Sequence, residues 1–556
     1  MTHRVGQEER NTMSTTITGA DALAQGAIEA GVSLVTGYAG APATSVVDSL
    51  LKLSKEETIR VEWTSNEKVA IEMAFGASVA GARSLLCVKS VGLNIALDPL
   101  MAMNLTGCNA GFVILLGDDP GGWGSQNEQD TRSLGLAAEL PVLEPVSVPE
   151  GREAVMEAFQ LSEEWSLPVI VRFTSPFVAG KVTKDWGQAV LPSSKASGQK
   201  PFHRHVILPI DVVPFHHRLH QKLKTIETRF EESSFNHEQG EGEYGVIAAG
   251  FIFSKMMDVI GAFLPKELRV FGLGTFFPLP RARLSAFLKK VKRVLVLEET
   301  APLVEGGVRS LAQEQGLTLP VCGRDTSHLP YAGELLGPHI AVALNRFCPV
   351  LSIPEEGERT RSMISRQSLC EGCPYIPTFD ALLEALSGIG GRDRAVIVGE
   401  PGCMVRGQLQ PYDLLDVKTS LGSSIGMGTG IALAMAKHHE NKRVVALCGD
   451  SSFLHSDVNA LMDAARAGVN LLVLILDNGI TALSGGQPHP GSPRDARGNP
   501  RSAVDMAALA RASGANRVET VPVHSKDRLK AAIENGLKAE GLSVIVASGP
   551  CPRYEK

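Results

Sequence analysis

Two groups of residues in this 556-residue sequence combine types and spacings that suit chemistry. The first is the cysteine pair in SLCEGCPYIP, Cys370 and Cys373. A pair spaced in this way can form a thiol–disulfide switch, half of a zinc site or an anchor for an iron–sulfur cluster, or can serve none of these purposes. Zinc and iron–sulfur sites both need further ligands. Cys403 and Cys551 are candidates because each follows a predicted strand, and the strand ends of one sheet lie close together.

The second group lies where two other predicted strands end. The apolar run VVALC is followed by Gly449, Asp450 and Ser451, and the run NLLVLIL is followed by Asp477 and Asn478. An aspartate and an asparagine at two strand ends can hold one magnesium ion, because carboxylate and amide oxygens are hard ligands and a diphosphate supplies more. The alternative is that both are ordinary polar residues at the start of loops.

A glycine-rich stretch, LGSSIGMGTG, precedes this group in the sequence. Its residues Gly422, Ser423 and Ser424 open a predicted helix, where backbone N–H groups suit a phosphate. A stretch of this kind is weak evidence when it stands alone.

The elements that must position these residues follow an alternating pattern. From about residue 17 to 185, short β-rich runs such as SLVTGY, SLLCVK and GFVILLG alternate with amphipathic stretches such as NEKVAIEMAFGASVAG. This alternation predicts a parallel, doubly wound α/β sheet. A polar region at 186–242 is expected to be a linker with some helix. A second α/β unit is predicted at 243–350, and a third at 351–556.

The composition bounds the class of protein. The residues are 44% hydrophobic and 21% charged, as in globular proteins. The formal net charge of −6 does not indicate the excess of basic residues that binding to nucleic acid requires. No apolar run approaches the roughly 18 residues of a membrane span. Residues 1–16 lack an apolar segment, so we expect a flexible tail and not a signal peptide. Nine irregularly placed cysteines do not indicate a disulfide framework, and we expect a cytoplasmic protein.

Several long stretches resemble the thiamine diphosphate-dependent 2-oxoacid:acceptor oxidoreductases, and in particular the alpha subunits of indolepyruvate:ferredoxin oxidoreductases. They are TGYAGAPATSVVDSL, DDPGGWGSQNEQDTR, DSSFLHSDVNAL and GGQPHPG, and the likeness extends from about Ile17 to Pro552. The resemblance implies a multidomain thiamine diphosphate-binding fold. It has a pyrimidine-binding domain at 17–185, a transketolase C-terminal-like domain at 243–350 and a diphosphate-binding domain at 351–556, so that two doubly wound domains flank a smaller one.

The resemblance also implies roles for particular residues. Glu67 matches the glutamate that hydrogen-bonds the aminopyrimidine ring of the cofactor, although an isolated glutamate in the first turn of a helix is usually a partner of the helix dipole. Asp450, Asn478 and the backbone carbonyl of Ile480 match the magnesium ligands. Further cofactor-binding positions are Gly422, Ser423, Ser424, Gly449, Ser451 and Gln487.

Other polar residues are less specific. His455 and His489 are candidates for moving protons near the diphosphate or the substrate, and the alternative for each is a structural hydrogen bond in a loop. Lys89, Asn94, Gln126 and Asn127 lie in loops of the first domain and are expected to face the site.

The same resemblance narrows the interpretation of the cysteines. The set Cys370, Cys373, Cys403 and Cys551 resembles the ligands of the [4Fe–4S] cluster nearest the cofactor in 2-oxoacid:ferredoxin oxidoreductases. A zinc site and unligated thiols remain alternatives.

The implied reaction is the oxidative decarboxylation of an aryl or branched 2-oxo acid, with electrons passing to the cluster and the acyl group passing to coenzyme A. The implied partners are a smaller beta subunit and ferredoxin or another electron acceptor, in a dimer of alpha–beta pairs. The alternatives are a non-oxidative thiamine diphosphate-dependent decarboxylase or carboligase, and a non-catalytic subunit that keeps the fold as a scaffold.

The sequence departs from the family pattern at several positions. Tyr375 and Ile376 stand where a histidine and an arginine are expected, and Ser90 and Gly486 each replace a histidine. We also expect no ferredoxin-like domain after the diphosphate-binding domain, so that electrons would leave through another protein or cofactor. These changes put indolepyruvate itself in doubt as the substrate, while a 2-oxo acid remains the expected class.

Overall fold

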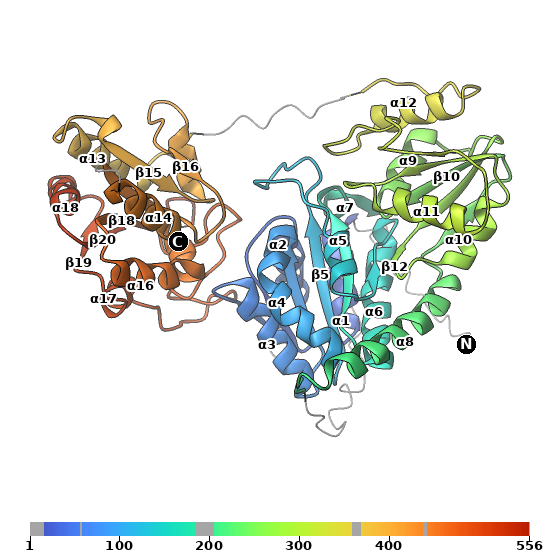
Figure 1. Cartoon of the computed structure of the whole chain (residues 1–556), viewed down its shortest axis with the longest axis horizontal. Helices are drawn as coiled ribbons and strands as arrows, with labels where there is room; N and C mark the ends of the chain where they lie inside the picture. The colour runs from blue at the N-terminus through green and yellow to red at the C-terminus, as the bar shows by residue number, and fades with distance from the viewer. Residues whose placement is uncertain (1–15, 56–57, 184–204, 358–367, 438–441, 555–556) are drawn as a thin grey trace, which may run out of the picture.

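The computed structural model describes residues 16–55, 58–183, 205–357, 368–437 and 442–554. They form three α/β units, which Figure 1 colours blue to cyan, green to yellow, and orange to red along the chain. The expected tail, apart from Thr16, lies outside the described residues. Among the described helices, none is long and apolar enough to cross a membrane.

The N-terminal unit is built on a twisted sheet with the strand order β12-β6-β7-β5-β4-β2-β3. All neighbouring strands in it are parallel except β12, which pairs antiparallel with β6. The expectation of a parallel, doubly wound sheet is therefore confirmed. The strands are β2 (Leu34–Gly37), β3 (Arg60–Trp63), β4 (Ser84–Lys89), β5 (Phe112–Asp118), β6 (Val142–Leu143), β7 (Val169–Thr174) and β12 (Thr275–Phe277).

Helices cover both faces of this sheet. Helices α1, α2 and α6 supply one apolar core, and α3 and α4 contribute to the core on the other face. A small antiparallel pair, β1 with β8, joins the two ends of the unit. The elements are β1 (Thr16–Thr18), α1 (Gly19–Glu29), α2 (Ala43–Leu53), α3 (Glu67–Val79), α4 (Ser90–Thr106), α5 (Arg132–Ala137), α6 (Val148–Trp165), α7 (Ser175–Ala179) and β8 (Lys181–Thr183).

The middle unit has a second sheet, ordered β14-β13-β10-β11-β9, in which β9 is an antiparallel edge strand. Its helices and strands are β9 (His237–Gln239), β10 (Tyr244–Ala249), α9 (Ile252–Ile260), β11 (Leu268–Leu273), α10 (Arg281–Leu288), β13 (Arg293–Leu297), α11 (Leu303–Glu314), β14 (Val321–Cys322) and α12 (Gly337–Phe347). Strand β12, which follows β11, leaves this sheet and completes the N-terminal one. One continuous core contains side chains of both units, from Ala70 to Ala312.

The region expected to be a linker contains a long helix, α8 (Val212–Glu231), while its first part, 184–204, lies outside the described residues. The apolar face of α8, formed by Leu219, Leu223, Ile226 and Phe230, is buried in the core of the N-terminal unit. The helix is polar in composition because its other face is exposed to water. Figure 1 shows it in green beside α6.

The C-terminal unit has a fully parallel sheet with the order β16-β15-β17-β18-β20-β19. Its apolar strands are buried on both faces by two separate cores, as is usual for parallel sheets covered by helices. The elements are α13 (Tyr375–Ser387), β15 (Ala395–Gly399), β16 (Val417–Lys418), α14 (Ser424–Lys437), β17 (Arg443–Gly449), α15 (Asp450–Ser452), α16 (Val458–Ala467), β18 (Leu471–Asp477), α17 (Met506–Ala512), β19 (Arg517–Pro522), α18 (Lys526–Lys538) and β20 (Leu542–Ser548), with short helical turns at Arg392–Arg394, Cys403–Gln408 and Phe453–Asp457.

Candidate active site

A cavity of about 1090 Å³ lies where the N-terminal and C-terminal units meet. Tyr38, Glu67, Lys89 and Trp123 line it from the N-terminal unit. The C-terminal unit contributes Gly449, Asp450, Ser451, His455, Asn478 and Ile480. Most of these residues follow the carboxyl end of a strand, which is where open α/β sheets bind ligands. The structure therefore brings most of the predicted cofactor and magnesium residues into one cavity with Glu67.

Glu67 is held at the start of α3 by contacts from both units. Asn66 caps the helix by accepting a hydrogen bond from the Val69 N–H at 2.9 Å, and its side-chain amide donates to the His455 carbonyl at 2.9 Å. His455 Nε2 lies 2.8 Å from Glu67 Oε2, and both side chains are buried. This carboxylate is thus directed across the boundary between the units, into the cavity, and is more than a partner of the helix dipole.

Gly92 in α4 allows the close approach of that helix to Glu67. A Cβ atom at residue 92 would lie 2.7 Å from Glu67 Oε1 and 2.8 Å from its Cγ. Any side chain at this position would displace the carboxylate.

Asp450 occupies a rigid position at the end of β17 and is 2% exposed. Its Oδ2 accepts hydrogen bonds from the N–H groups of Asn478 at 3.0 Å and Gly479 at 2.7 Å, which begin the loop after the neighbouring strand β18. The Asn478 Oδ1 accepts from the Ile480 N–H at 3.1 Å. Magnesium prefers oxygen ligands such as carboxylates and amides. Asp450 and Asn478, fixed at adjacent strand ends, therefore suit that ion.

His489 lies behind Asp450 and does not line the cavity. Its Nδ1 accepts a hydrogen bond from the Gly491 N–H at 3.0 Å, so Nε2 carries the proton of the neutral ring. Nε2 lies 3.2 Å from Asp450 Oδ2 without hydrogen-bond geometry, and it is buried with no hydrogen-bond partner among the described residues. His489 Nε2 therefore faces the carboxylate of the predicted magnesium site.

Four of the predicted cofactor positions are not at the cavity wall. Ser420 and Leu421 line the cavity, whereas Gly422, Ser423, Ser424 and Gln487 do not. The Ser423 hydroxyl donates to the Ser420 carbonyl at 2.7 Å, and Gln487 accepts from the Ser484 hydroxyl at 2.9 Å.

The backbone N–H groups at the start of α14 already have protein acceptors. Gly422 N–H donates to the Ser452 hydroxyl at 3.1 Å, and Ser424 N–H donates to Glu400 at 2.9 Å. Glu400 is a buried carboxyl group at the end of β15, beside Asp457. Burial, together with the nearby Glu400, raises the pKa of Asp457 well above its usual value. Protein side chains therefore accept these two N–H groups, and the role of residues 422–424 in binding a phosphate stays a prediction.

The four cysteines of the predicted cluster line a second, smaller pocket next to the cavity. Cys370 and Cys373 form a turn before α13, whereas Cys403 and Cys551 follow β15 and β20. Burial raises the pKa of Cys403 to about 11, and the neighbouring thiols raise it while Arg406 lowers it. Five residues line both pockets and so form a shared wall between them: Cys403, Arg406, Asn478, Ala482 and Leu483.

Tyr375, one of the positions that departs from the family pattern, lines the cavity and contacts Asn478 of the shared wall. Its hydroxyl donates to the Leu476 carbonyl at 3.2 Å and accepts from the Asn478 side-chain amide at 2.9 Å. Burial raises the pKa of Tyr375 well above its usual value, so the phenol remains protonated. The sequence marked this residue as unusual but gave no sign that it contacts Asn478, a predicted magnesium ligand.

A second departure, Gly486, also has a structural reason. Its φ is +83°, and a Cβ atom there would lie 2.6 Å from Cδ1 of Tyr554. The ring of Tyr554 thus occupies the space that a histidine side chain would need.

The comparisons with known proteins agree with this arrangement. Residues 25–186 match the thiamine diphosphate-binding domain of pyruvate flavodoxin/ferredoxin oxidoreductase. Residues 401–547 match the C-terminal thiamine pyrophosphate-binding domain of thiamine pyrophosphate enzymes. The cavity lies between the two matched segments, since Glu67 belongs to the first and Asp450 to the second.

Relatives cover nearly the whole chain. Indolepyruvate oxidoreductase subunit IorA of Methanothermobacter thermautotrophicus is 34% identical over 96% of this chain and 86% of its own length. Its counterpart in Pyrococcus horikoshii is 31% identical over 96% of this chain and 85% of its own length. A solved 2-oxoglutarate:ferredoxin oxidoreductase from Magnetococcus marinus aligns with 62% of this chain and 67% of its own, at 17% identity and a TM-score of 0.47. The chain belongs to the family of indolepyruvate oxidoreductase subunits IorA, which are thiamine diphosphate-dependent 2-oxoacid oxidoreductases.

Proposed function

We propose that this chain is the catalytic subunit of an enzyme that oxidatively decarboxylates an aryl or branched 2-oxo acid. Its electrons would pass to a [4Fe–4S] cluster and its acyl group to coenzyme A. The observation that carries this proposal is the wall shared by the cavity and the cysteine pocket, to which Cys403 and Asn478 belong. An electron acceptor held by the cysteines would lie directly beside the reacting cofactor.

Bound thiamine diphosphate supplies the electron sink for the loss of CO₂ from a 2-oxo acid. Glu67 is the residue we assign to the hydrogen bond with the aminopyrimidine ring, since its buried carboxylate faces the cavity. Asp450, Asn478 and the carbonyl of Ile480 are assigned to magnesium. His455 holds Glu67 in position through their 2.8 Å contact, and it lines the cavity where a proton could be moved.

One observation, the spacing of the sulfur atoms, favours a cluster over a zinc ion at Cys370, Cys373, Cys403 and Cys551. All four line one pocket. Among the described residues, no three of their sulfur atoms lie within 4.8 Å of one another, whereas zinc–sulfur bonds of about 2.3 Å would draw tetrahedral ligands closer than that. A cubane cluster presents an iron at each of four corners and therefore accepts more widely spaced thiolates.

Lys89 is our candidate for holding the substrate carboxylate. It lines the cavity together with Gln126, whereas Asn94 and Asn127 do not. Its Nζ donates to the Ser125 hydroxyl at 2.8 Å, and burial lowers its pKa while Asp119 and Glu67 favour the charged form. The apolar residues Trp123, Ile95 and Leu483 line the same cavity and suit a bulky side chain on the substrate.

We also propose that the chain works with a smaller subunit and passes electrons to ferredoxin or another acceptor, in a dimer of such pairs. The names of the curated relatives support the first point, since each of those proteins is a subunit of an indolepyruvate oxidoreductase.

The test is anaerobic purification of the chain with its partner, followed by iron analysis and addition of a 2-oxo acid. We expect about four irons per chain, and we expect the visible absorbance to bleach when indolepyruvate and thiamine diphosphate are present. Cys403→Ser should lose iron, whereas Cys322→Ser, which changes a buried cysteine outside the pocket, should keep it. A colourless protein that releases CO₂ without an electron acceptor would instead support the non-oxidative alternative.

Glu67→Gln tests the catalytic assignment separately. The variant should keep its iron and its fold but lose turnover by about 10²–10⁴-fold, the usual contribution of a positioned acid–base group. Retained turnover would remove Glu67 from the mechanism, and binding of neither iron nor thiamine diphosphate to the parent chain would support the scaffold alternative.

A further inference from the structure

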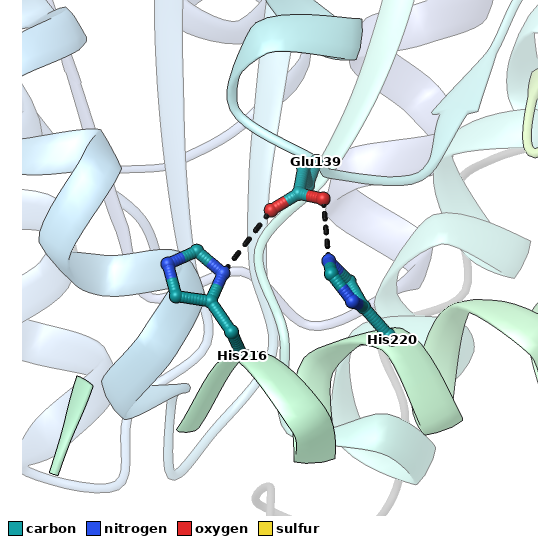
Figure 2. A group of neighbouring side chains, drawn as sticks. All are labelled: Glu139, His216 and His220. Atoms are coloured by element: carbon teal, nitrogen blue, oxygen red, sulfur yellow. Dashed lines mark hydrogen bonds and ion pairs between the residues drawn. The ribbon is translucent and has the colours of Figure 1, made fainter. Parts of the chain in front are cut away.

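A cluster of three side chains outside the active site has the composition of a metal site. His216 and His220 project from α8 toward Glu139, which lies in the turn after α5, as Figure 2 shows. The ligand atoms of all three lie within 4.8 Å of one another. Among the residues that the structure describes, this is the one group of three or more histidine, cysteine, aspartate or glutamate side chains that meets this distance.

The two histidines share one face of the helix because they are four residues apart, which is about one turn. His220 Nε2 lies 2.7 Å from one oxygen of Glu139, and His216 Nδ1 lies 3.4 Å from the other. The single carboxylate is therefore directed at both rings, and the ring centroids are 5.8 Å apart.

Glu139 is held in place by an unusual backbone conformation. Its φ is +52°, a left-handed value that is uncommon for residues other than glycine. Its N–H donates to the Leu136 carbonyl at 3.1 Å, which closes the turn after α5. The turn thereby presents the side chain of Glu139 to α8.

We propose that Glu139, His216 and His220 bind one divalent transition-metal ion, for which zinc is the probe. Two imidazoles and a carboxylate are a common zinc ligand set, whereas magnesium and calcium prefer oxygen ligands throughout. The side chains are 30%, 42% and 56% exposed for Glu139, His216 and His220, so water can reach the ion and complete its coordination.

The site would fasten a helix that already connects two units. Toward its C-terminal end, Arg229 of α8 pairs with Glu157 of α6 at 3.1 Å, and Glu231 accepts hydrogen bonds from the backbone of Ala282 and Arg283 at the start of α10. The proposed metal lies near the other end of α8 and would fix that end to the N-terminal unit. A ligand that binds the folded state in this way raises its stability.

The experiment measures zinc binding to the full chain by competition with a chromophoric chelator. The variants are the double substitution His216→Ala/His220→Ala and the single substitution Glu139→Gln. His217→Ala is the matched control, because His217 lies between the two ligands in the sequence and is exposed. Because the cysteine pocket can also bind zinc, the quantity compared is the difference in bound zinc between each variant and the parent chain. Cobalt is used in parallel, because nitrogen and oxygen ligands give no thiolate charge-transfer band.

We expect the double variant to lose one zinc equivalent per chain, together with the zinc-dependent rise in melting temperature. Glu139→Gln should weaken zinc binding by at least about tenfold, and His217→Ala should match the parent. Equal zinc stoichiometry and affinity in the parent and the double variant would overturn the proposal, as would a cobalt spectrum that the double substitution leaves unchanged. Either result would mean that the three side chains are joined by hydrogen bonds alone.

Discussion

The N-terminal unit meets its two neighbours through contacts of very different kinds. Toward the middle unit it shares a sheet, through β12, and a continuous apolar core. Between the N-terminal and C-terminal units lies the active-site cavity. Among the described residues, the two apolar cores of the C-terminal unit contain only side chains of that unit. The first boundary resembles the inside of one domain, and the second is a boundary between two.

Buried charges reinforce the first boundary. Arg172 lies 2.8 Å from Asp118, also pairs with Glu144, and donates to the Glu299 carbonyl of the middle unit at 3.1 Å. Arg132 pairs with Asp130 at 2.6 Å and with Glu298 at 3.0 Å. Burial alone would raise the pKa of Asp130, but the two guanidinium groups hold it well below its usual range.

Polar contacts around the cavity hold the N-terminal and C-terminal units together at the second boundary. Asn66 and Glu67 contact His455, and Arg497 donates to the backbone of Ser54 and Ile59. A cofactor must enter and be held there, so a fully packed apolar interface would leave no room for it. The difference implies that changes at the first boundary act on folding, whereas changes at the second act on cofactor binding.

The largest expected effect follows from breaking the first boundary. Arg172→Met removes the guanidinium and leaves Asp118 and Glu144 buried without that partner. Loss of one member of a buried ion pair destabilises a protein by about 3–5 kcal/mol. We expect a loss of this size in the free energy of unfolding, measured by denaturant titration.

Arg229→Ala is the control for this prediction, because its ion pair with Glu157 is half-exposed and should contribute about 1 kcal/mol or less. A similar, small effect of both substitutions would mean that the buried charges do not hold the two units together.

Asp450→Asn tests the second boundary at its metal site. The change keeps the shape of the side chain but removes the charge, so we expect magnesium-dependent thiamine diphosphate binding to weaken by about 100-fold. Isothermal titration with and without magnesium measures it. Asp463→Asn, on the exposed face of α16, is the control and should bind like the parent. Unchanged affinity in Asp450→Asn would contradict the assignment of this residue to magnesium.

Tyr375→Phe tests whether the cysteine pocket and the metal site are linked. It removes the hydroxyl that accepts from Asn478, and a hydrogen bond of this kind contributes about 1 kcal/mol. We therefore expect thiamine diphosphate binding to weaken by about fivefold, with the iron content unchanged. If the iron is lost and the affinity for thiamine diphosphate stays the same, Tyr375 supports the cysteines and not Asn478.

The two boundaries also differ in how far the sequence predicted them. Strand ends located Asp450, Asn478, Cys403 and Cys551, because parallel strands bring their carboxyl ends to one edge of a sheet, whereas Cys370 and Cys373 were found by their spacing. The role of Glu400 was missed, because a glutamate after a strand is common. Nothing in the local sequence shows that it accepts a hydrogen bond from the backbone at the start of α14. Strand β12 was missed as well, because TFF is too short to reveal which sheet it joins. The polar composition of α8 hid its apolar face within a segment expected to be a linker.

The smallest expected effect concerns Arg497, which crosses the second boundary away from the cavity. Its guanidinium donates to the Ser54 carbonyl at 3.2 Å, the Ser54 hydroxyl at 3.1 Å and the Ile59 carbonyl at 3.2 Å. Arg497→Ala should weaken thiamine diphosphate binding about threefold, because the partly exposed contacts orient the two units and do not touch the cofactor. Arg494→Ala, whose side chain contacts Gly498 within the same loop, should have no effect. If Arg497→Ala instead destabilised the fold as strongly as Arg172→Met, the two boundaries would be equivalent, and the cavity would lie inside a single cooperative unit.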